Sequence, residues 1–238
     1  FRDYHPDESD FLLCYDYRSL AFDSSALASY REIHLVAWSM GVWAAAQVLS
    51  ELPLPLTKCI AVNGTPFPID DEKGIPEAVF NGTLEGFSPV TLQKFRRRMC
   101  GSTETVKAFL AHEPFRPLEE LREELACLKQ EIVSRPAAPF KWDKAVIGSR
   151  DKIIPACNQE AAWRDTETIV CDEEHYSEAL FRDELIFMSE CLFPNADSSP
   201  MTLIGRMKPD LKLFIRSYPP NPCSPRTLVL RKKSFRCG

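Results

Sequence analysis

The chain has 238 residues and a net charge of −5, which suits one large domain, or one domain with an insertion or a tail. Its composition, 45% apolar and 26% charged, is that of an ordinary globular protein. No apolar run approaches the roughly 20 residues of a membrane helix, and no basic start followed by an apolar stretch indicates a secretory signal. We therefore expect no membrane partner and a cytoplasmic location.

The nine cysteines are scattered from Cys14 to Cys237 and form no C-x-x-C pair, so neither a zinc ribbon nor a redox motif is predicted. Their odd number and irregular spacing are typical of reduced cysteines in a cytoplasmic protein. We expect neither a metal nor another cofactor. Two Asn-Gly-Thr triplets, at Asn63 and Asn81, are interpreted as turns, because Asn-Gly is a common turn dipeptide.

Five short apolar runs, rich in β-branched and aromatic residues, predict strands that are buried on both faces. Helical patterns follow two of them, at residues 41–52 and 157–164. Strands that alternate with helices in this way predict a mostly parallel α/β sheet. The expected strands are residues 11–15, 33–38, 59–62, 145–147 and 168–171.

A long segment, residues 67–139, separates the third and fourth expected strands. It is rich in helical patterns, at residues 90–99, 103–112 and 118–133, and it is too long for a simple crossover. We interpret it as a helical lid over the sheet edge, with residues 1–66 and 140–193 forming the core. The last helix is amphipathic, with an apolar face made of Leu118, Leu121, Leu125, Leu128 and Ile132.

The composition changes from Pro194 onward. Residues 194–238 are rich in proline and hold nine Lys and Arg residues against two acids, Asp197 and Asp210, whereas the rest of the chain is acidic. This pattern predicts a basic, Pro-rich tail or linker. Such a tail could contact nucleic acid or an acidic partner, but a disordered extension accounts for it more simply, and we expect no nucleic-acid partner.

The sequence A-W-S-M-G, residues 37–41, lies between an expected strand and an expected helix. It fits the small-x-Ser-x-small pattern of a nucleophile elbow, in which small residues let a strained turn lift the serine hydroxyl out of the sheet. The elbow would make Ser39 a nucleophile and place the Met40 N–H at a helix N-terminus, where it can stabilise an oxyanion. The alternative is that Ser39 only caps the helix.

An elbow serine requires an acid and a histidine later in the chain, in the order Ser, Asp, His. Asp151 follows the fourth expected strand and His175 follows the fifth, where such a sheet collects its functional groups. We predict that His175 is the general base and that Asp151 orients it. The alternatives are a turn-capping Asp151 and a surface His175. Other candidates are Asp70 or Asp71 for the acid, a packed His34, and His5 and His112, which have no supporting context.

Several blocks of this sequence resemble the BioG family, the pimeloyl-acyl-carrier-protein methyl ester esterases of biotin synthesis. The resemblance extends over about residues 1–193, and its blocks are FLLCYDYRSL, YREIHLVAWSMGVWAA, VNGTPFPIDDEKGIPEAVFNGTLE, FRRRMCG and VIGSRDKIIPACNQEAAW. It implies an α/β-hydrolase core with a helical lid, and hydrolysis of pimeloyl-ACP methyl ester to pimeloyl-ACP and methanol. Carried over by motif, Ser39 is the nucleophile and His175 the base; Asp151 is our assignment of the acid.

The same resemblance implies sequence that would precede residue 1. Family members begin with a strand and a Gly-Trp-Gly-type loop that supplies a second oxyanion N–H, and this chain starts after that point. We therefore expect that N-terminal strands of the sheet are missing. Loss of one oxyanion donor typically lowers turnover by ~10²–10³.

The resemblance also implies a partner, an acyl-carrier protein (ACP) that carries the pimeloyl methyl ester. Such a carrier is small and acidic, and the expected lid contains Arg96, Arg97 and Arg98, followed by Arg116. Arginine binds both carboxylates and phosphates, here the phosphopantetheine phosphate. Three consecutive helical residues fan around the helix, so they cannot all face one partner, and a solvated helix face is the alternative.

The pimeloyl chain requires an apolar slot. Trp38 and Met40 flank the expected nucleophile and should line the floor of this slot. The lid candidates are Phe67, Phe80, Phe87 and Phe95, although aromatic side chains in such a segment also serve simply as core.

Two other functions stay open at this point. The same fold also supports other acyl esterases or thioesterases, because a fold does not define a substrate. A truncated hydrolase core could also be inactive and serve as a binding module.

Overall fold

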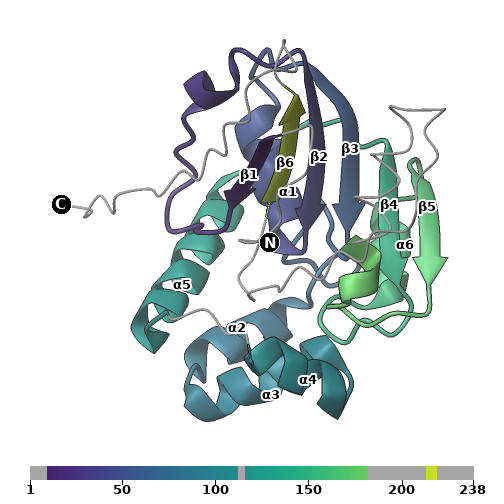
Figure 1. The fold of residues 1–238 in the computed structure, drawn as a ribbon. Coiled ribbons are helices and arrows are strands. Elements are labelled where there is room, and N and C mark those ends of the chain that lie inside the picture. The colour runs from purple at the N-terminus through teal and green to yellow at the C-terminus, as the bar shows by residue number, and fades with distance from the viewer. Residues whose placement is uncertain (1–9, 112–115, 182–212, 219–238) are drawn as a thin grey trace.

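The computed structural model describes residues 10–111, 116–181 and 213–218. Its six-stranded sheet has the order β1-β6-β2-β3-β4-β5 (Figure 1). The pairs β2–β3, β3–β4 and β4–β5 are parallel, which confirms the predicted mostly parallel α/β sheet. All five expected strands are present, with ends that differ by at most three residues: β1 (Asp10–Cys14), β2 (Glu32–Trp38), β3 (Leu56–Val62), β4 (Lys144–Gly148) and β5 (Glu167–Cys171).

The sixth strand, β6 (Leu213–Tyr218), was not expected, because it lies in the stretch interpreted as a basic tail. It sits between β1 and β2 and is antiparallel to both, with Ile215 opposite Leu12 on one side and Leu35 on the other. Its apolar run is short, and pairing with strands far away in the sequence leaves no local signal. The other residues of 194–238 lie outside the described part of the chain, and the division into core, lid and tail stays a prediction.

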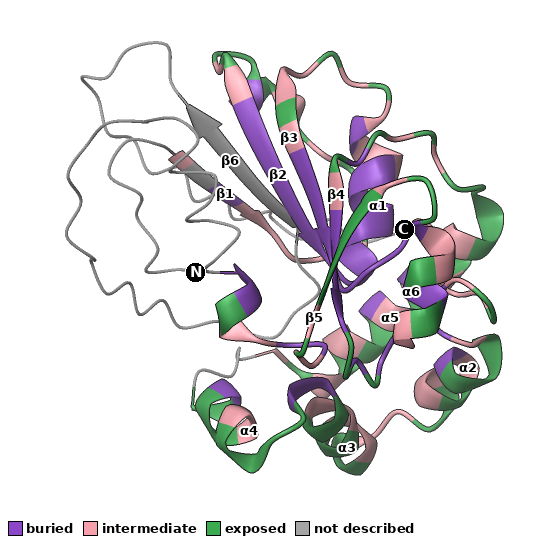
Figure 2. Ribbon diagram, turned by 90° about the vertical axis from the view of Figure 1, so that its right-hand side faces the viewer, coloured by how far each residue is buried: buried purple, intermediate pink, exposed green. Residues whose placement is uncertain are grey.

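The central strands are buried on both faces, as their nearly continuous apolar sequences predict (Figure 2). Along β2, alternate side chains enter different clusters of buried residues: Leu35 and Ala37 join one cluster, and Val36 and Trp38 join the other. This alternation is the two-residue period of a strand. Trp38, at the end of β2, therefore points into the cluster that also contains lid residues such as Phe80.

Seven helical elements accompany the sheet in the described part of the chain. Two of the expected lid helices begin at serine caps: Ser88 accepts a hydrogen bond from the Thr91 N–H and Ser102 from the Thr105 N–H. The N-terminal lid helix was missed, because Asn81-Gly82 in its middle was interpreted as a turn. The elements are η1 (Ser24–Leu27), α1 (Met40–Leu49), α2 (Glu77–Glu85), α3 (Pro89–Cys100), α4 (Thr103–Leu110), α5 (Leu118–Ser134) and α6 (Ala156–Ala162).

The helices α2, α3 and α4 gather beyond the ends of the sheet toward which the β2 and β3 arrows point (Figure 1). Helix α5 packs with the apolar face expected from its sequence: Leu128 is buried, and Leu125 and Ile132 pack against the core. Within the described ranges, the helices are all too short or too polar to cross a membrane. The helices α2 to α5 are hereafter called the lid.

Candidate active site

Four residues with polar side chains follow the carboxyl ends of four adjacent parallel strands. Ser39 follows β2 directly, Asn63 follows β3 directly, Asp151 comes shortly after β4, and His175 comes shortly after β5. Because the strands are parallel, these ends lie at one edge of the sheet, where open α/β sheets collect their functional groups. The tertiary structure thus brings Ser39, Asp151 and His175 together from three separate parts of the chain.

The backbone at Ser39 has the strained shape that an elbow requires. Its φ of 56° and ψ of −128° lie in a region that L-residues rarely occupy, and the strand before it changes directly into α1 after it. The Ser39 side chain makes no capping hydrogen bond to α1, so the helix-cap alternative is wrong for its hydroxyl. Gly64 allows this turn, because a Cβ at that position would lie 2.4 Å from the Ser39 carbonyl oxygen.

Ser39, His175 and Asp151 form a continuous chain of hydrogen bonds. His175 Nε2 lies 3.0 Å from Ser39 Oγ, and His175 Nδ1 lies 2.7 Å from Asp151 Oδ2. A carboxylate only accepts hydrogen bonds, so Nδ1 carries the proton of the neutral ring and Nε2 accepts the serine O–H. All three residues are buried, with exposed fractions of 4%, 1% and 7%. In this arrangement the imidazole can remove the serine proton.

The Asp151 carboxylate accepts hydrogen bonds from four donors. Its Oδ1 accepts the backbone N–H groups of Ile153 and Ile154 at 2.7 and 3.0 Å, and its Oδ2 accepts Gln159 Nε2 at 2.8 Å as well as the histidine. Gln159 is fully buried and also donates to the Ile154 carbonyl. These donors fix the orientation of the carboxylate toward His175.

The competing residues have other partners. Asp70 accepts the N–H groups of Glu72 and Lys73, and Asp71 accepts the Glu77 N–H at the start of α2. His34 lies in the middle of β2, with its Nε2 2.8 Å from Glu32 Oε1. His5 and His112 lie outside the described residues.

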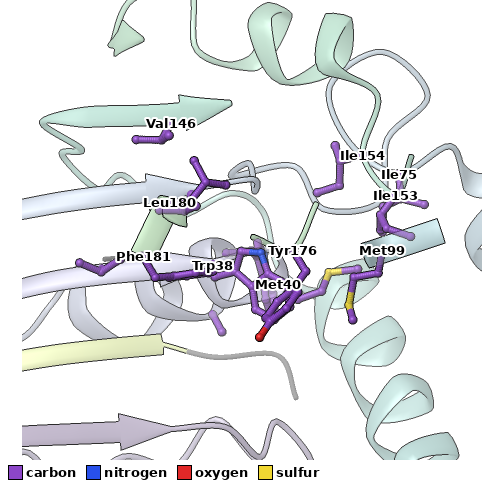
Figure 3. Close-up of a cluster of buried hydrophobic side chains, with 14 of the residues drawn as sticks. Trp38, Met40, Ile75, Met99, Val146, Ile153, Ile154, Tyr176, Leu180 and Phe181 are labelled. Atoms are coloured by element: carbon purple, nitrogen blue, oxygen red, sulfur yellow. The ribbon is translucent and has the colours of Figure 1, made fainter. Parts of the chain in front are cut away.

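The first helical residue after the serine is Met40. The first four N–H groups of a helix have no intrahelical acceptor, and they lie at the positive end of the helix dipole. The Met40 N–H is therefore in the position expected for an oxyanion donor. The Met40 side chain is buried in the same apolar cluster as Trp38 and Tyr176 (Figure 3).

A cavity of about 150 Å³ opens beside Ser39 and His175, between the sheet edge and the lid. Its walls are mostly apolar. Four of the five aromatic residues expected in the substrate slot line it, namely Trp38, Phe80, Phe87 and Phe95, together with Met40. Phe67 is not among the lining residues; Lys73 Nζ lies 4.8 Å from the centre of its ring.

The arginines expected to bind a carrier protein have three different environments. Arg96 and Arg98 line the cavity together with Lys152, whereas Arg97 does not line it; Arg97 and Arg98 are both exposed. Arg116 is mostly buried, and its Nη1 donates to Glu124 Oε2 at 2.8 Å. A buried guanidinium paired in this way is poorly placed to meet a protein partner, so we assign Arg116 to lid packing.

Glu124 is a buried acid in the cavity wall, and the sequence analysis did not identify it. It lies on α5 and joins the lid to the loop after β1, because its Oε1 accepts the Tyr17 N–H at 2.7 Å. Burial raises the pKa of the Glu124 carboxyl to about 7, although the Arg116 charge and the Tyr17 N–H act to lower it.

Three further polar groups at the site were not expected from the sequence: the carboxamides of Gln159 and Asn63, and the Lys152 ammonium group. Asn63 was interpreted as part of a turn, whereas the side chain of this residue is fully buried and hydrogen-bonded to the loop that carries His175. Lys152 directly follows the predicted acid, Asp151, in the sequence. This adjacency indicates that Lys152 lies at the cavity. Among the described residues, no group of three or more His, Cys, Asp or Glu side chains is arranged to hold a metal ion.

The sheet, the lid and the strained serine turn define an α/β-hydrolase fold. A crystal structure of BioG from Haemophilus influenzae is similar to the chain, with 41% identity and a TM-score of 0.64, over 70% of this chain and 77% of that one. The family model described as pimeloyl-ACP methyl esterase BioG matches residues 3–184. The chain therefore belongs to the BioG family, as the sequence blocks indicated.

Two curated proteins are also similar to the chain. A Bacteroides fragilis (strain 638R) protein named malonyl-[acyl-carrier protein] O-methyltransferase is 52% identical over 182 residues, which cover 76% of this chain but 37% of that relative. An uncharacterized Haemophilus influenzae protein is 43% identical over 159 residues, which cover 66% of this chain and 72% of the relative. The chain thus spans little more than a third of the length of the Bacteroides relative.

Proposed function

We propose that the protein is a serine carboxylesterase that hydrolyses the methyl ester of pimeloyl-ACP to pimeloyl-ACP and methanol, a step of biotin synthesis. The observation that carries the proposal is the hydrogen-bonded chain from Ser39 Oγ through His175 to Asp151, next to an apolar cavity. Membership of the BioG family supports the choice of substrate. The catalytic roles of the three residues are part of this proposal.

In the first half of the reaction, His175 Nε2 takes the proton of Ser39 Oγ as the oxygen attacks the ester carbonyl carbon. The carbonyl oxygen becomes negatively charged, and the Met40 N–H at the start of α1 stabilises this charge. Asp151 holds the imidazole in the required tautomer and stabilises its protonated form. His175 then gives the proton to the methoxy oxygen, so that methanol leaves and the acyl group stays on Ser39.

In the second half, His175 takes a proton from water as the water oxygen attacks the acyl-enzyme carbonyl carbon. The proton returns to Ser39 Oγ when the bond to the acyl group breaks. The product carries a free carboxyl group at the end that previously carried the methyl ester. Under this mechanism the residues at the carboxyl edge of the sheet perform the chemistry, and no cofactor takes part.

The cavity walls support a substrate with an apolar chain. Burial of each methylene group contributes ~0.8 kcal/mol, and Trp38, Phe80 and Phe95 supply the apolar surface. Arg96, Arg98 and Lys152 supply positive charge in the same cavity, which suits the phosphopantetheine phosphate and an acidic carrier protein. We propose Arg96, Arg98 and Lys152 as the docking cations, in place of Arg96, Arg97, Arg98 and Arg116.

The name of the Bacteroides relative does not lead us to propose methyl transfer for this chain. Most of that relative lies outside the aligned region. Within residues 3–184, which the family model matches, the chain offers a serine, a histidine and an aspartate joined by hydrogen bonds, which are the groups of an acyl-transfer enzyme rather than of a methyltransferase.

The test is to incubate the protein with pimeloyl-ACP methyl ester, follow the mobility of the ACP band and quantify methanol. We expect conversion by the unchanged protein and none by Ser39→Ala. Unchanged activity of Ser39→Ala would overturn the mechanism. A strong preference for free short p-nitrophenyl esters would indicate another esterase, and failure of a fluorophosphonate probe to label Ser39 would indicate a binding module.

A further inference from the structure

We propose that Asn63 is a positioning residue for His175, and that it acts by holding the backbone carbonyl of the histidine together with Trp38. The inference rests on the proposed function, because it assumes that His175 is the general base. It assigns a role to a residue that the sequence analysis interpreted only as part of an Asn-Gly turn.

The hydrogen-bonding groups of Asn63 connect three elements. Its backbone N–H donates to the Val146 carbonyl on β4 at 2.9 Å, and its Oδ1 accepts the Gly148 N–H at 2.6 Å. Its Nδ2 donates to the carbonyl oxygens of Glu174 and His175, both at 2.9 Å. The side chain therefore ties the ends of β3 and β4 to the loop that carries the histidine.

The geometry defines which way the Asn63 amide points. The group opposite Oδ1 is an N–H donor, and the two groups opposite Nδ2 are carbonyl acceptors, so the reverse orientation would lose all three hydrogen bonds. The residue is fully buried, and its φ of 42° lies in the left-handed region, which Asn tolerates better than most residues. Both the backbone shape and the side-chain contacts favour Asn at this position.

The His175 carbonyl receives a second hydrogen bond from the residue that precedes the nucleophile. Trp38 Nε1 donates to this oxygen at 2.9 Å, and the Trp38 ring lies against the imidazole with a centroid distance of 5.2 Å. Trp38 ends β2, immediately before Ser39. The two donors therefore fix the peptide group at His175 relative to both β2 and β3, which determines where the imidazole lies relative to Ser39 Oγ.

The rest of the histidine loop is close-packed, so the position of this peptide group matters. A Cβ at Gly148 would lie 2.5 Å from the Glu173 carbonyl oxygen, and the Tyr176 N–H donates to the Met99 carbonyl at the end of α3. The Tyr176 ring lies 6.2 Å from the Trp38 ring, centre to centre, in the same cluster of buried side chains as Met40 (Figure 3). If the hydrogen bonds of Asn63 are lost, the carbonyl groups of Glu174 and His175 lose the donor that ties them to β3. A displacement of the imidazole by about 1 Å can lower turnover by ~10².

A matched control separates positioning from stability. Asn158 is also buried, and its Nδ2 also donates to two backbone carbonyls, those of Asp71 and Gly74, at 3.0 and 2.9 Å. Its hydrogen bonds hold the loop before α2 and not the histidine loop. Asn158→Ala should therefore lower the melting temperature by an amount similar to the Asn63 variant and leave kcat within about twofold.

The test compares Asn63→Gly, which keeps the left-handed backbone accessible, with Asn158→Ala in the full chain. We expect Asn63→Gly to lower kcat for pimeloyl-ACP methyl ester by about 10- to 100-fold, with KM within about twofold. Trp38→Phe, which keeps an aromatic ring but removes the N–H donor, should lower kcat in the same direction and provides the answer if Asn63→Gly does not fold.

A second readout does not depend on turnover. The His175 Nδ1 proton, hydrogen-bonded to Asp151, should give a downfield proton NMR signal in the unchanged protein and in Asn158→Ala, and this signal should shift or disappear in Asn63→Gly. If Asn63→Gly keeps both kcat and the signal and loses only thermal stability, the inference is wrong. If the unchanged protein does not hydrolyse the ester, the proposed function fails, whereas the NMR comparison still decides whether Asn63 positions the histidine.

Discussion

The carboxyl edge of the sheet and the lid enclose one cavity, but they are built in different ways. At the edge, Ser39, Asp151 and His175 are buried and joined by hydrogen bonds to one another and to neighbouring backbone groups. The lid helices are exposed along much of their surface (Figure 2), with 43% of Val79 and 61% of Val90 accessible to solvent. The lid supplies mainly apolar side chains and cations to the cavity.

This difference shows how the two regions divide the proposed work. Hydrogen bonds are directional, so a network of them fixes the distances and angles that proton transfer requires. Apolar contacts are not directional, and a wall made of them can accept a flexible chain. We therefore expect changes at the edge to lower kcat, and changes in the lid to raise KM.

The largest effect should come from Asp151→Asn. An amide can donate to His175 Nδ1 and so favour the tautomer in which Nε2 carries the proton and cannot accept the serine O–H. We expect kcat to fall by about 10⁴, with KM almost unchanged. Steady-state kinetics with pimeloyl-ACP methyl ester measures this. The control is Asp71→Asn, because Asp71 binds the start of α2; an equal loss in both variants would contradict the assignment of the acid.

A smaller loss of kcat is expected from Gln159→Leu. The substitution removes the donor that lies 2.8 Å from Asp151 Oδ2 and leaves the volume almost the same. A hydrogen bond to a charged group contributes about 1.5–3 kcal/mol, which corresponds to about a 10- to 100-fold change in rate. Gln47→Leu is the matched control, because the Gln47 amide donates to the Pro136 carbonyl near the surface. Equal kcat in the two variants would show that Asp151 does not need this donor.

The lid should respond differently, through substrate binding. Arg97 and Arg98 are both exposed on α3, but only Arg98 lines the cavity. We expect Arg98→Glu to raise KM for pimeloyl-ACP methyl ester by about tenfold and Arg97→Glu to have little effect, because only the first places a negative charge near the carrier protein. Neither variant should change the hydrolysis of a p-nitrophenyl ester. The difference in KM between the two variants should become smaller in high salt. Equal effects of the two variants on KM would contradict the proposed docking role of Arg98.

The smallest effect on activity, but a clear effect on stability, is expected at Glu124. The carboxyl has a pKa of about 7 in the folded protein and an ordinary value of 4.5. The folded state therefore keeps the proton between these pH values while the unfolded state releases it, so the free energy of unfolding falls as pH rises from about 4.5 to about 7. The difference corresponds to roughly 3 kcal/mol.

Urea unfolding at pH 5 and pH 8 tests this expectation. Glu124→Gln cannot titrate at this position and should lose the fall in stability with pH. Glu131→Gln is the control on the same helix, because Glu131 pairs with Arg135 at the surface. The same pH dependence in Glu124→Gln and in the unchanged protein would show that the Glu124 carboxyl is not the source.

The parts of the fold that the sequence predicted are those with a strong local pattern. The strands β2 to β4 could be predicted from their apolar runs, because both faces of these strands are buried. The serine elbow could be predicted because its small residues, the strand before it and the helix after it are all neighbours in the sequence. Helix α2 was missed because Asn81-Gly82 is a local turn signal, which the helix overrides.

Much of the site could not be predicted, because its contacts join distant residues. The sequence left Asp70 or Asp71 as alternatives to Asp151 for the proposed acid. Only the folded chain shows that Asp151 is the one that lies 2.7 Å from His175 Nδ1. The carboxamides of Asn63 and Gln159 leave no pattern in the sequence that separates them from turn or helix residues. Their partners lie on other elements, and only the tertiary structure identifies them.

By itself, then, the sequence determined most of the elements of this protein, though not α2 or β6, and its chemical groups, because burial and backbone geometry impose short-range patterns on the chain. The tertiary structure decided which groups meet, which side of α3 faces the cavity, and that β6 lies between β1 and β2. The physical reason is the range of the interactions: side-chain periodicity acts over a few residues, whereas hydrogen bonds such as that from Asn63 to His175 act over 112 positions in the chain.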